Sequence, residues 1–199
     1  NFENSTSNRI KSFLNESFDN PLKKYVFTNK AITENKLYPY SEIPEFVKIF
    51  NTNFLDEINL VKLLIREKLK NKLTDLRTNY WFYSGLEIYL LNKYIDKYHA
   101  DKKLIGNYSQ FPFFKNHNVS NYSFNDHFFL INKFVFSRDL NQKVSSLPED
   151  LTRINYRLNN PYISFNYLKY LENFIGAESF KQSINELLNN SNDDLSQVF

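Results

Sequence analysis

The chain of 199 residues contains neither cysteine nor methionine. Without cysteine it has no disulfide bond and no thiolate ligand for a metal. A chain without thiols is compatible with any redox environment, so this absence does not indicate a compartment. Because a primary translation product begins with methionine, the missing methionine at position 1 predicts a processed form or a fragment of a longer polypeptide.

Glycine, net charge and long apolar runs are also scarce. The three glycines lie far apart, at positions 85, 106 and 176, which excludes a glycine-rich phosphate-binding loop. The 25 basic and 22 acidic residues are spread along the chain and leave a net charge of +3, so no basic block indicates a nucleic-acid partner. No apolar run approaches the roughly 18 residues of a transmembrane segment.

Hydrophobic residues, in contrast, are abundant. They make up 42% of the chain, and aromatic residues alone make up 18%. This content excludes global disorder and is sufficient for the core of a single domain, or of a domain fragment, over residues 1–199. The polar segment at residues 189–199 is expected to be a flexible tail.

Apolar residues at spacings of three and four predict a mainly helical fold. After a polar, frayed start at residues 4–8, a first helical pattern contains Ile10, Phe13, Leu14 and Phe18. The two clearest helices are expected over residues 54–72 and 79–98. The first of these carries an apolar stripe formed by Phe54, Ile58, Val61, Ile65 and Leu69.

The remaining segments are expected to be helical with a little strand near the N-terminus. Further helices are predicted over residues 124–138, 148–158, 162–175 and 177–188. The last two meet at Gly176, a residue type that favours helix C-termini. KKYVFT, residues 23–28, is the best strand candidate, and residues 37–46 and 111–124 are expected to be loops.

One motif resembles a zinc peptidase. The segment WFYSGLEIYL, residues 81–90, is similar to the pattern W-x-x-E-G-x-x-x-Y-L of the aminopeptidase N family of gluzincins. The segments at residues 38–46, YPYSEIPEF, and 93–107, KYIDKYHADKKLIGN, resemble the bacterial branch of this family. The positions that match the W-x-x-E-G-x-x-x-Y-L pattern are Trp81, Gly85, Tyr89 and Leu90. In that family the glutamate of this motif is the third zinc ligand, and Ser84 takes its place here.

The same resemblance locates the other zinc-site positions. In the family, eighteen residues separate this glutamate from the second histidine of H-E-x-x-H, which supplies two zinc ligands and the general base. The corresponding segment here is VKLLI, residues 61–65. Val61 and Ile65 therefore replace the two histidines, and Lys62 replaces the general base. Val61 and Ile65 also belong to the predicted apolar stripe, so spacing and periodicity agree.

A second segment resembles the helix pair that follows the catalytic tyrosine of the family. It matches the pattern L-x-x-L-E-x-x-x-G-x-x-x-F at Leu168, Leu171, Gly176 and Phe180. The tyrosine itself would fall near Pro161 or Tyr162. The resemblance covers about residues 36–188 and implies the α-rich part of a thermolysin-like metallopeptidase catalytic domain.

The resemblance implies a domain without peptidase activity. Zinc requires nitrogen, sulfur or carboxylate ligands, which Val61 and Ile65 lack and Ser84 provides poorly. A charged Lys62 would repel zinc and cannot accept a proton from water. We therefore expect a pseudopeptidase without a metal or other cofactor, serving as a binding or scaffolding module for a protein or peptide. Family members suggest an exported or cell-envelope (periplasmic) location.

A residual cleft of such a domain would be lined by four residues: Trp81, Tyr83, Glu87 and Tyr162. A structurally paired carboxylate is the simpler interpretation of Glu87, and core packing is the simpler interpretation of Val61 and Ile65. Two other functions stay open. The chain could be a fragment of an active aminopeptidase-like enzyme whose catalytic residues lie elsewhere, or an unrelated α-helical protein-interaction domain.

Other candidate features are weaker. The three histidines, His99, His117 and His127, have no metal-ligand spacing among themselves, and His99 is expected near a helix C-terminus. The aromatic segment HFFLINKFVF, residues 127–136, predicts either core packing or an exposed partner surface.

Overall fold

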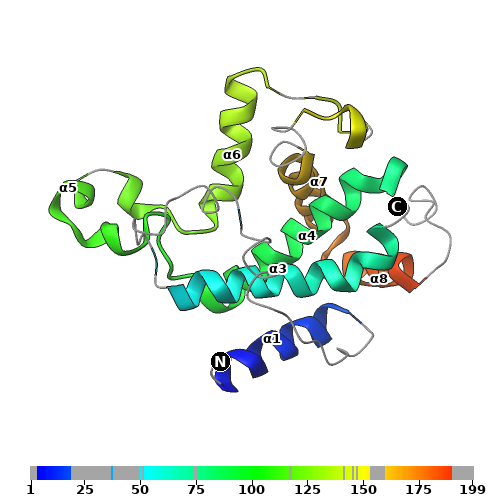
Figure 1. The fold of residues 1–199 in the computed structure, drawn as a ribbon, viewed down its shortest axis with the longest axis horizontal. Helices are drawn as coiled ribbons and strands as arrows, with labels where there is room; N and C mark the ends of the chain where they lie inside the picture. The colour runs from blue at the N-terminus through cyan, green and yellow to red at the C-terminus, as the bar shows by residue number, and fades with distance from the viewer. Residues whose placement is uncertain are drawn as a thin grey trace.

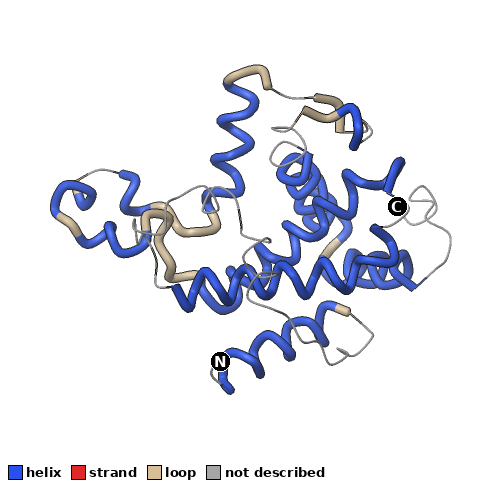
Figure 2. The backbone as a smooth tube through the Cα atoms, viewed as in Figure 1, coloured by secondary structure: helices blue, strands red, loops and turns tan. Residues whose placement is uncertain are grey.

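The computed structural model describes residues 4–18, 37, 50, 52–73, 76–116, 118–140, 142–144, 146, 148–152 and 160–189. Within these residues the fold is mainly helical and contains no strand, only an isolated antiparallel bridge between Lys103 and Ser123 (Figure 2). The α-helices are α1 (Asn4–Ser17), α3 (Thr52–Leu73), α4 (Leu76–His99), α5 (Pro112–Lys115), α6 (Asp126–Ser137), α7 (Asn160–Ile175) and α8 (Ala177–Asn189). Three 3-10 turns are η1 (Gly106–Gln110), η2 (Asn118–Asn121) and η3 (Pro148–Asp150).

Helix α4 is the central element. It packs against α3 and α7, while α1 packs on α3, α6 on α7, and α8 follows α7 (Figure 1). Residues 85–92 of α4 are buried without interruption. A helix that is apolar on all sides is typical of the centre of a bundle, whereas a surface helix has one apolar stripe. The mostly apolar sequence of this stretch, interrupted by Glu87 and Asn92, therefore favours the central position of α4.

Helix α3 has the predicted one-sided pattern. All five stripe residues are buried, and Ile58, Val61, Ile65 and Leu69 have no exposed surface. Burying such a side chain contributes about 1.5–3 kcal/mol. The stripe faces the core, and Asp56 and Arg66 are exposed, whereas Glu57 is buried beside the stripe.

Helices α4 and α7 approach closely at Gly85. A Cβ atom at this position would lie 2.4 Å from Ser164 Cβ and 2.9 Å from the Ser164 carbonyl carbon. Only glycine therefore permits the observed crossing. Gly176 has a different role: its φ of +89° ends α7 and lets α8 turn back, as predicted for a helix C-terminus.

Most of the predicted helices are confirmed, with three corrections. Residues 4–8 are not frayed, because α1 begins at Asn4 and already buries Thr6. The expected loop at residues 111–124 contains α5 and η2. Of the helix predicted over residues 148–158, the described part has only the turn η3 and two non-helical residues.

Some expectations lie outside the described residues. These are the strand at residues 23–28, the loop at residues 37–46 except Leu37, and the tail beyond residue 189. Among the described helices, none combines the length and apolar character needed to cross a membrane.

Candidate functional site

The positions that the resemblance assigns to zinc ligands lie on α3 and α4. Val61 and Ile65 on α3 have no exposed surface and belong to the main core, together with Phe82 and Tyr83 of α4. The prediction that both aliphatic residues are buried is confirmed. Neither side chain offers an atom that could bind a metal.

Charged residues of the same two helices pair with one another. Arg66 binds Glu87 through two hydrogen bonds, with Nε 2.8 Å from Oε2 and Nη2 3.1 Å from Oε1. Lys62 Nζ lies 3.8 Å from Glu87 Oε1. Glu87 is only 5% exposed, so this is a desolvated carboxylate with two cations beside it. The prediction that Glu87 is structurally paired is confirmed. The sequence also favours a Lys62 that is either exposed or paired with a carboxylate, and the structure has the paired form.

Burial determines the protonation behaviour of Lys62. Desolvation lowers the pKa of Lys62 below its ordinary value, and the nearby Glu87 carboxylate opposes this shift. The pair with Glu87 thus reduces the cost of keeping an ammonium group inside the helix pair.

Ser84 has a local hydrogen bond. Its hydroxyl donates to the Trp81 carbonyl 3.1 Å away, within the same helix, and the side chain is half-buried. A nucleophilic serine would require a base at its hydroxyl, whereas here a backbone carbonyl occupies that position. Convergence of Ser84 with Val61 and Ile65 stays a prediction.

The four candidate cleft residues differ in exposure. Tyr83 and Tyr162 are fully buried and Glu87 is nearly so, whereas Trp81 is half-buried. The Tyr162 ring centroid is 5.7 Å from that of Phe128, and the Tyr162 carbonyl accepts a hydrogen bond from Asn132 at 2.8 Å. Tyr83 and Tyr162 thus fill core space between helices.

Histidines and carboxylates do not assemble a metal centre in the described part of the chain, where no group of three His, Asp or Glu has suitable geometry. His127 is buried, and its Nδ1 lies 2.5 Å from the Phe124 carbonyl. Burial lowers the pKa of His127 to about 4. His99 contacts a carboxylate, and His117 lies outside the described residues.

Sequence reasoning missed a buried charge cluster around Glu57, which joins α1, α3 and α4. Arg9 donates to both carboxylate oxygens, at 2.9 Å from Nε and 2.6 Å from Nη2, and Tyr94 also donates to Glu57. His99 Nε2 lies 2.8 Å from Oε1. Burial opposes ionisation of Glu57, but these hydrogen bonds outweigh it and lower its pKa to about 2. The sequence feature that could have indicated this cluster is the position of Glu57 directly before Ile58, a residue of the apolar stripe of α3.

A cavity of about 340 Å³ was also missed. It lies between α1, α4 and α8, and its walls include Phe13, Leu90 and Phe180. The ion pair between Lys93 and Glu172, 2.5 Å long, lies at its edge. The cavity is lined by apolar side chains and by charged side chains of both signs. This mixture does not favour one class of ligand.

Comparisons with protein-family models, with curated proteins and with solved structures find no match.

Proposed function

We propose that the chain is a pseudopeptidase of the aminopeptidase N type, which retains the α-rich part of a thermolysin-like fold as a module for binding a protein or peptide. The observation that carries this proposal is the pairing of Arg66 and Lys62 with the buried Glu87, beside the fully buried Val61 and Ile65. The charged side chains between α3 and α4 thus pair with one another, and Val61 and Ile65, at the positions of the histidine ligands, pack in the hydrophobic core.

Zinc chemistry has no support at these positions. A catalytic zinc site uses three protein ligands and an open fourth position for water. Val61 and Ile65 provide neither ligands nor an opening, because both are completely buried. Lys62 stands at the general-base position, where burial lowers its pKa and its Nζ lies 3.8 Å from Glu87 Oε1. Hydrolysis through this site is therefore not expected.

Metal analysis and an activity assay test the inactive state. The purified protein should contain no stoichiometric zinc and should not cleave aminoacyl p-nitroanilides before or after zinc addition. About one zinc per chain that a chelator removes, together with hydrolysis, would contradict the proposal.

Restoring the family's ligands tests whether the site has been repacked. The variant combines Val61→His, Lys62→Glu, Ile65→His and Ser84→Glu. We expect no activity, because Tyr83 and Tyr162 occupy core space and Arg66 remains beside Glu87. Tight zinc binding with peptide cleavage would instead indicate an open cleft and a peptidase that lost only its metal.

The binding role can be measured with the only tryptophan of the chain. Trp81 is half-buried on α4, three residues before Ser84, so its emission reports on this region. Alanine-based hexapeptides with a free or acetylated N-terminus should change the Trp81 emission saturably. A calorimetric titration of Trp81→Phe checks that the peptide still binds without the reporter. If neither peptide binds in either measurement, a peptide-binding role for this helix pair is rejected.

A further inference from the structure

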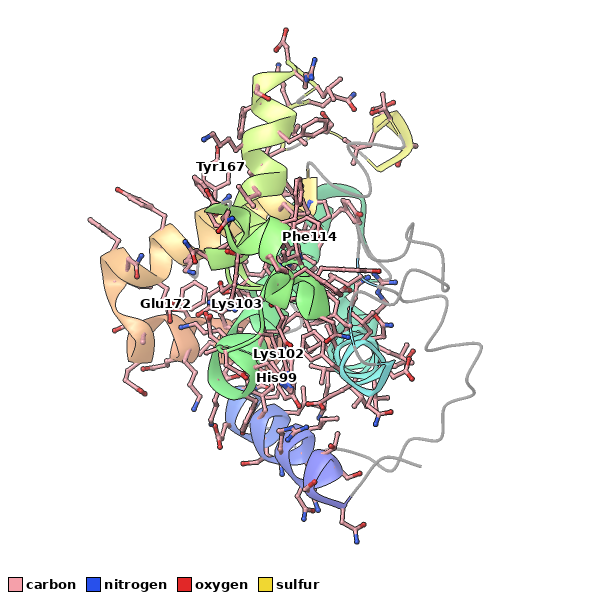
Figure 3. All side chains as sticks on the ribbon, turned by 90° about the vertical axis from the view of Figure 1, so that its left-hand side faces the viewer. His99, Lys102, Lys103, Phe114, Tyr167 and Glu172 are labelled. Atoms are coloured by element: carbon pink, nitrogen blue, oxygen red, sulfur yellow. The ribbon has the colours of Figure 1, made fainter. Side chains whose placement is uncertain are left out.

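Residues 105–116 and 118–121 form a projecting unit, which we call the α5 lobe. Its neck is closed by the Lys103–Ser123 bridge, where Leu104 N donates to the Tyr122 carbonyl at 3.0 Å and Phe124 N donates to the Lys102 carbonyl at 2.6 Å. The lobe extends away from α4 and α7 at the left edge of Figure 1 and lies at the front of Figure 3, where Phe114 and Lys103 are labelled. It is thus a convex tip on a narrow base.

The tip exposes two phenylalanines around a proline. Phe111 is 54% exposed and Phe113 is 69% exposed. The Tyr108 ring centroid lies 5.8 Å from that of Phe111 and 6.2 Å from that of Phe114, and the Phe114 ring in turn lies 5.3 Å from that of Phe113. Tyr108 and Phe114, both half-buried, therefore support the outward position of the two exposed rings.

The backbone of the tip is suited to an apolar environment. Pro112 has no N–H group, and the N–H groups of Phe114 and Lys115 both donate to the Phe111 carbonyl at 3.0 Å. Backbone donors that enter a lipid phase must be satisfied within the protein. These hydrogen bonds remove part of the cost of placing the tip among lipids.

Charge distinguishes the α5 lobe from the other exposed aromatic surfaces. Between Asp101 and Asp126 the chain has three lysines, Lys102, Lys103 and Lys115, and no carboxylate. This +3 equals the net charge of the whole chain, 25 − 22 = +3, so the remainder is balanced. The exposed aromatic residues of α6 and α7 lie on helices that each carry one lysine and one acidic residue.

We infer that the α5 lobe is a peripheral membrane anchor, which inserts Phe111 and Phe113 into a lipid surface that carries negative charge. Aromatic side chains with adjacent lysines are the combination that binds such interfaces, since the rings enter the acyl boundary while the ammonium groups bind anionic head groups. Lys115 is two residues from Phe113 and acts at the tip, and the exposed Lys103 acts from the neck. The ammonium group of Lys102 lies over the Phe54 ring of α3, 5.7 Å from its centroid, and contributes only through its charge. This inference does not depend on the proposed pseudopeptidase function.

Vesicle sedimentation tests the anchor with the full chain. Wild type should bind vesicles of phosphatidylcholine mixed with phosphatidylserine and should bind pure phosphatidylcholine much more weakly. Phe111→Ser with Phe113→Ser should weaken binding at least tenfold, because each ring loses its apolar burial. Lys115→Gln should weaken binding to the anionic vesicles about fivefold, and added salt should also weaken this binding.

Matched control variants distinguish specific binding through the α5 lobe from non-specific binding through other exposed aromatic side chains. Phe136→Ser with Phe174→Ser removes two rings of similar exposure, 56% and 75%, on α6 and α7 and should leave binding unchanged. Lys133→Gln on α6 is the control for Lys115. Circular dichroism should show equal helix content in all variants, since the substituted side chains are exposed.

Insertion itself can be measured with a tryptophan at the tip. In a Trp81→Phe background, Phe113→Trp should be quenched by brominated lipid in anionic vesicles. The inference is overturned if wild type binds anionic and neutral vesicles equally weakly, or if the α6 and α7 control loses as much binding as the lobe variant. Binding to single-stranded DNA without binding to vesicles would equally reject it and would assign the lobe to nucleic acid.

Discussion

At the scale of one residue, Ile65 occupies the position that the proposed alignment gives to a histidine ligand. It has no exposed surface, so Ile65→Ala would leave a cavity between α3 and α4. We expect the free energy of unfolding to fall by about 2–5 kcal/mol. Urea denaturation measures this value, and Leu60→Ala, at a partly buried position of the same helix, should cost less. A loss below about 1 kcal/mol for Ile65→Ala would indicate that the site is not tightly packed.

His127 should make stability depend on pH. Its pKa is about 4 in the folded state and 6.5 in a model compound, so the unfolded chain binds a proton that the folded chain excludes. The free energy of unfolding should therefore decrease as the pH falls below 6.5, by about 2 kcal/mol between pH 7 and 5. His127→Asn keeps a donor near the Phe124 carbonyl but cannot titrate, and it should lose less stability over this range. Equal pH dependence of both proteins in urea titrations would assign the effect to another group.

At the scale of elements, the crossing of α4 and α7 depends on Gly85. Gly85→Ala adds a Cβ that would lie 2.4 Å from Ser164 Cβ, so the two helices must separate. We expect a loss of about 1–3 kcal/mol from overpacking, which exceeds the roughly 1 kcal/mol that alanine contributes to helix propensity. Adding Ser164→Gly should recover part of the loss in thermal unfolding. A more stable Gly85→Ala protein would contradict the close approach.

The elements also differ in how well the sequence predicts them. Helix α3 was predictable from its long apolar periodicity, and α4 from the length and high apolar content of its segment. Helix α5 was not, because four residues give no periodic signal and its position depends on the neck between Lys103 and Ser123. The network around Glu57 was not predictable either, since Arg9 and Glu57 are 48 residues apart and only the fold brings them together.

At the candidate site, the sequence predicted which residues are buried or paired better than it predicted their partners. It indicated that Val61 and Ile65 are core residues and that Glu87 is paired. It did not indicate that Arg66 donates two hydrogen bonds to Glu87. Which residues of two helices meet depends on the rotation of each helix about its axis, and a local sequence pattern does not give this rotation. Helical periodicity fixes which face of α3 is apolar, but it does not fix which flank meets α4.

For the whole molecule, the Glu57 cluster fastens the N-terminal helix to the bundle. Arg9→Met keeps most of the aliphatic length but removes both hydrogen bonds to a carboxylate that is 4% exposed. Arg9 is 30% exposed, and Tyr94 and His99 still contact the Glu57 carboxylate in its absence. We therefore expect a loss of about 1.5–3 kcal/mol, the range for hydrogen bonds to a charged group. Hydrogen exchange should accelerate throughout α1. Lys97→Met breaks the exposed pair with Glu16 and should have a smaller effect, below about 1 kcal/mol. Unchanged exchange in α1 of Arg9→Met would show that apolar contacts alone hold this helix.

The central position of α4 also has a consequence for the order in which the molecule assembles. Its partners in α3 are near in sequence, 21 residues apart for Arg66 and Glu87, whereas its partners in α7 are distant, 79 residues apart for Lys93 and Glu172. Closing the longer loop costs about 1 kcal/mol more entropy, so the α3–α4 hairpin should form in the folding transition state and α7 should dock afterwards. In stopped-flow experiments, Ile65→Ala should then slow folding, while Gly85→Ala should mainly accelerate unfolding. A folding rate that Gly85→Ala reduces in proportion to the lost stability would reverse this order.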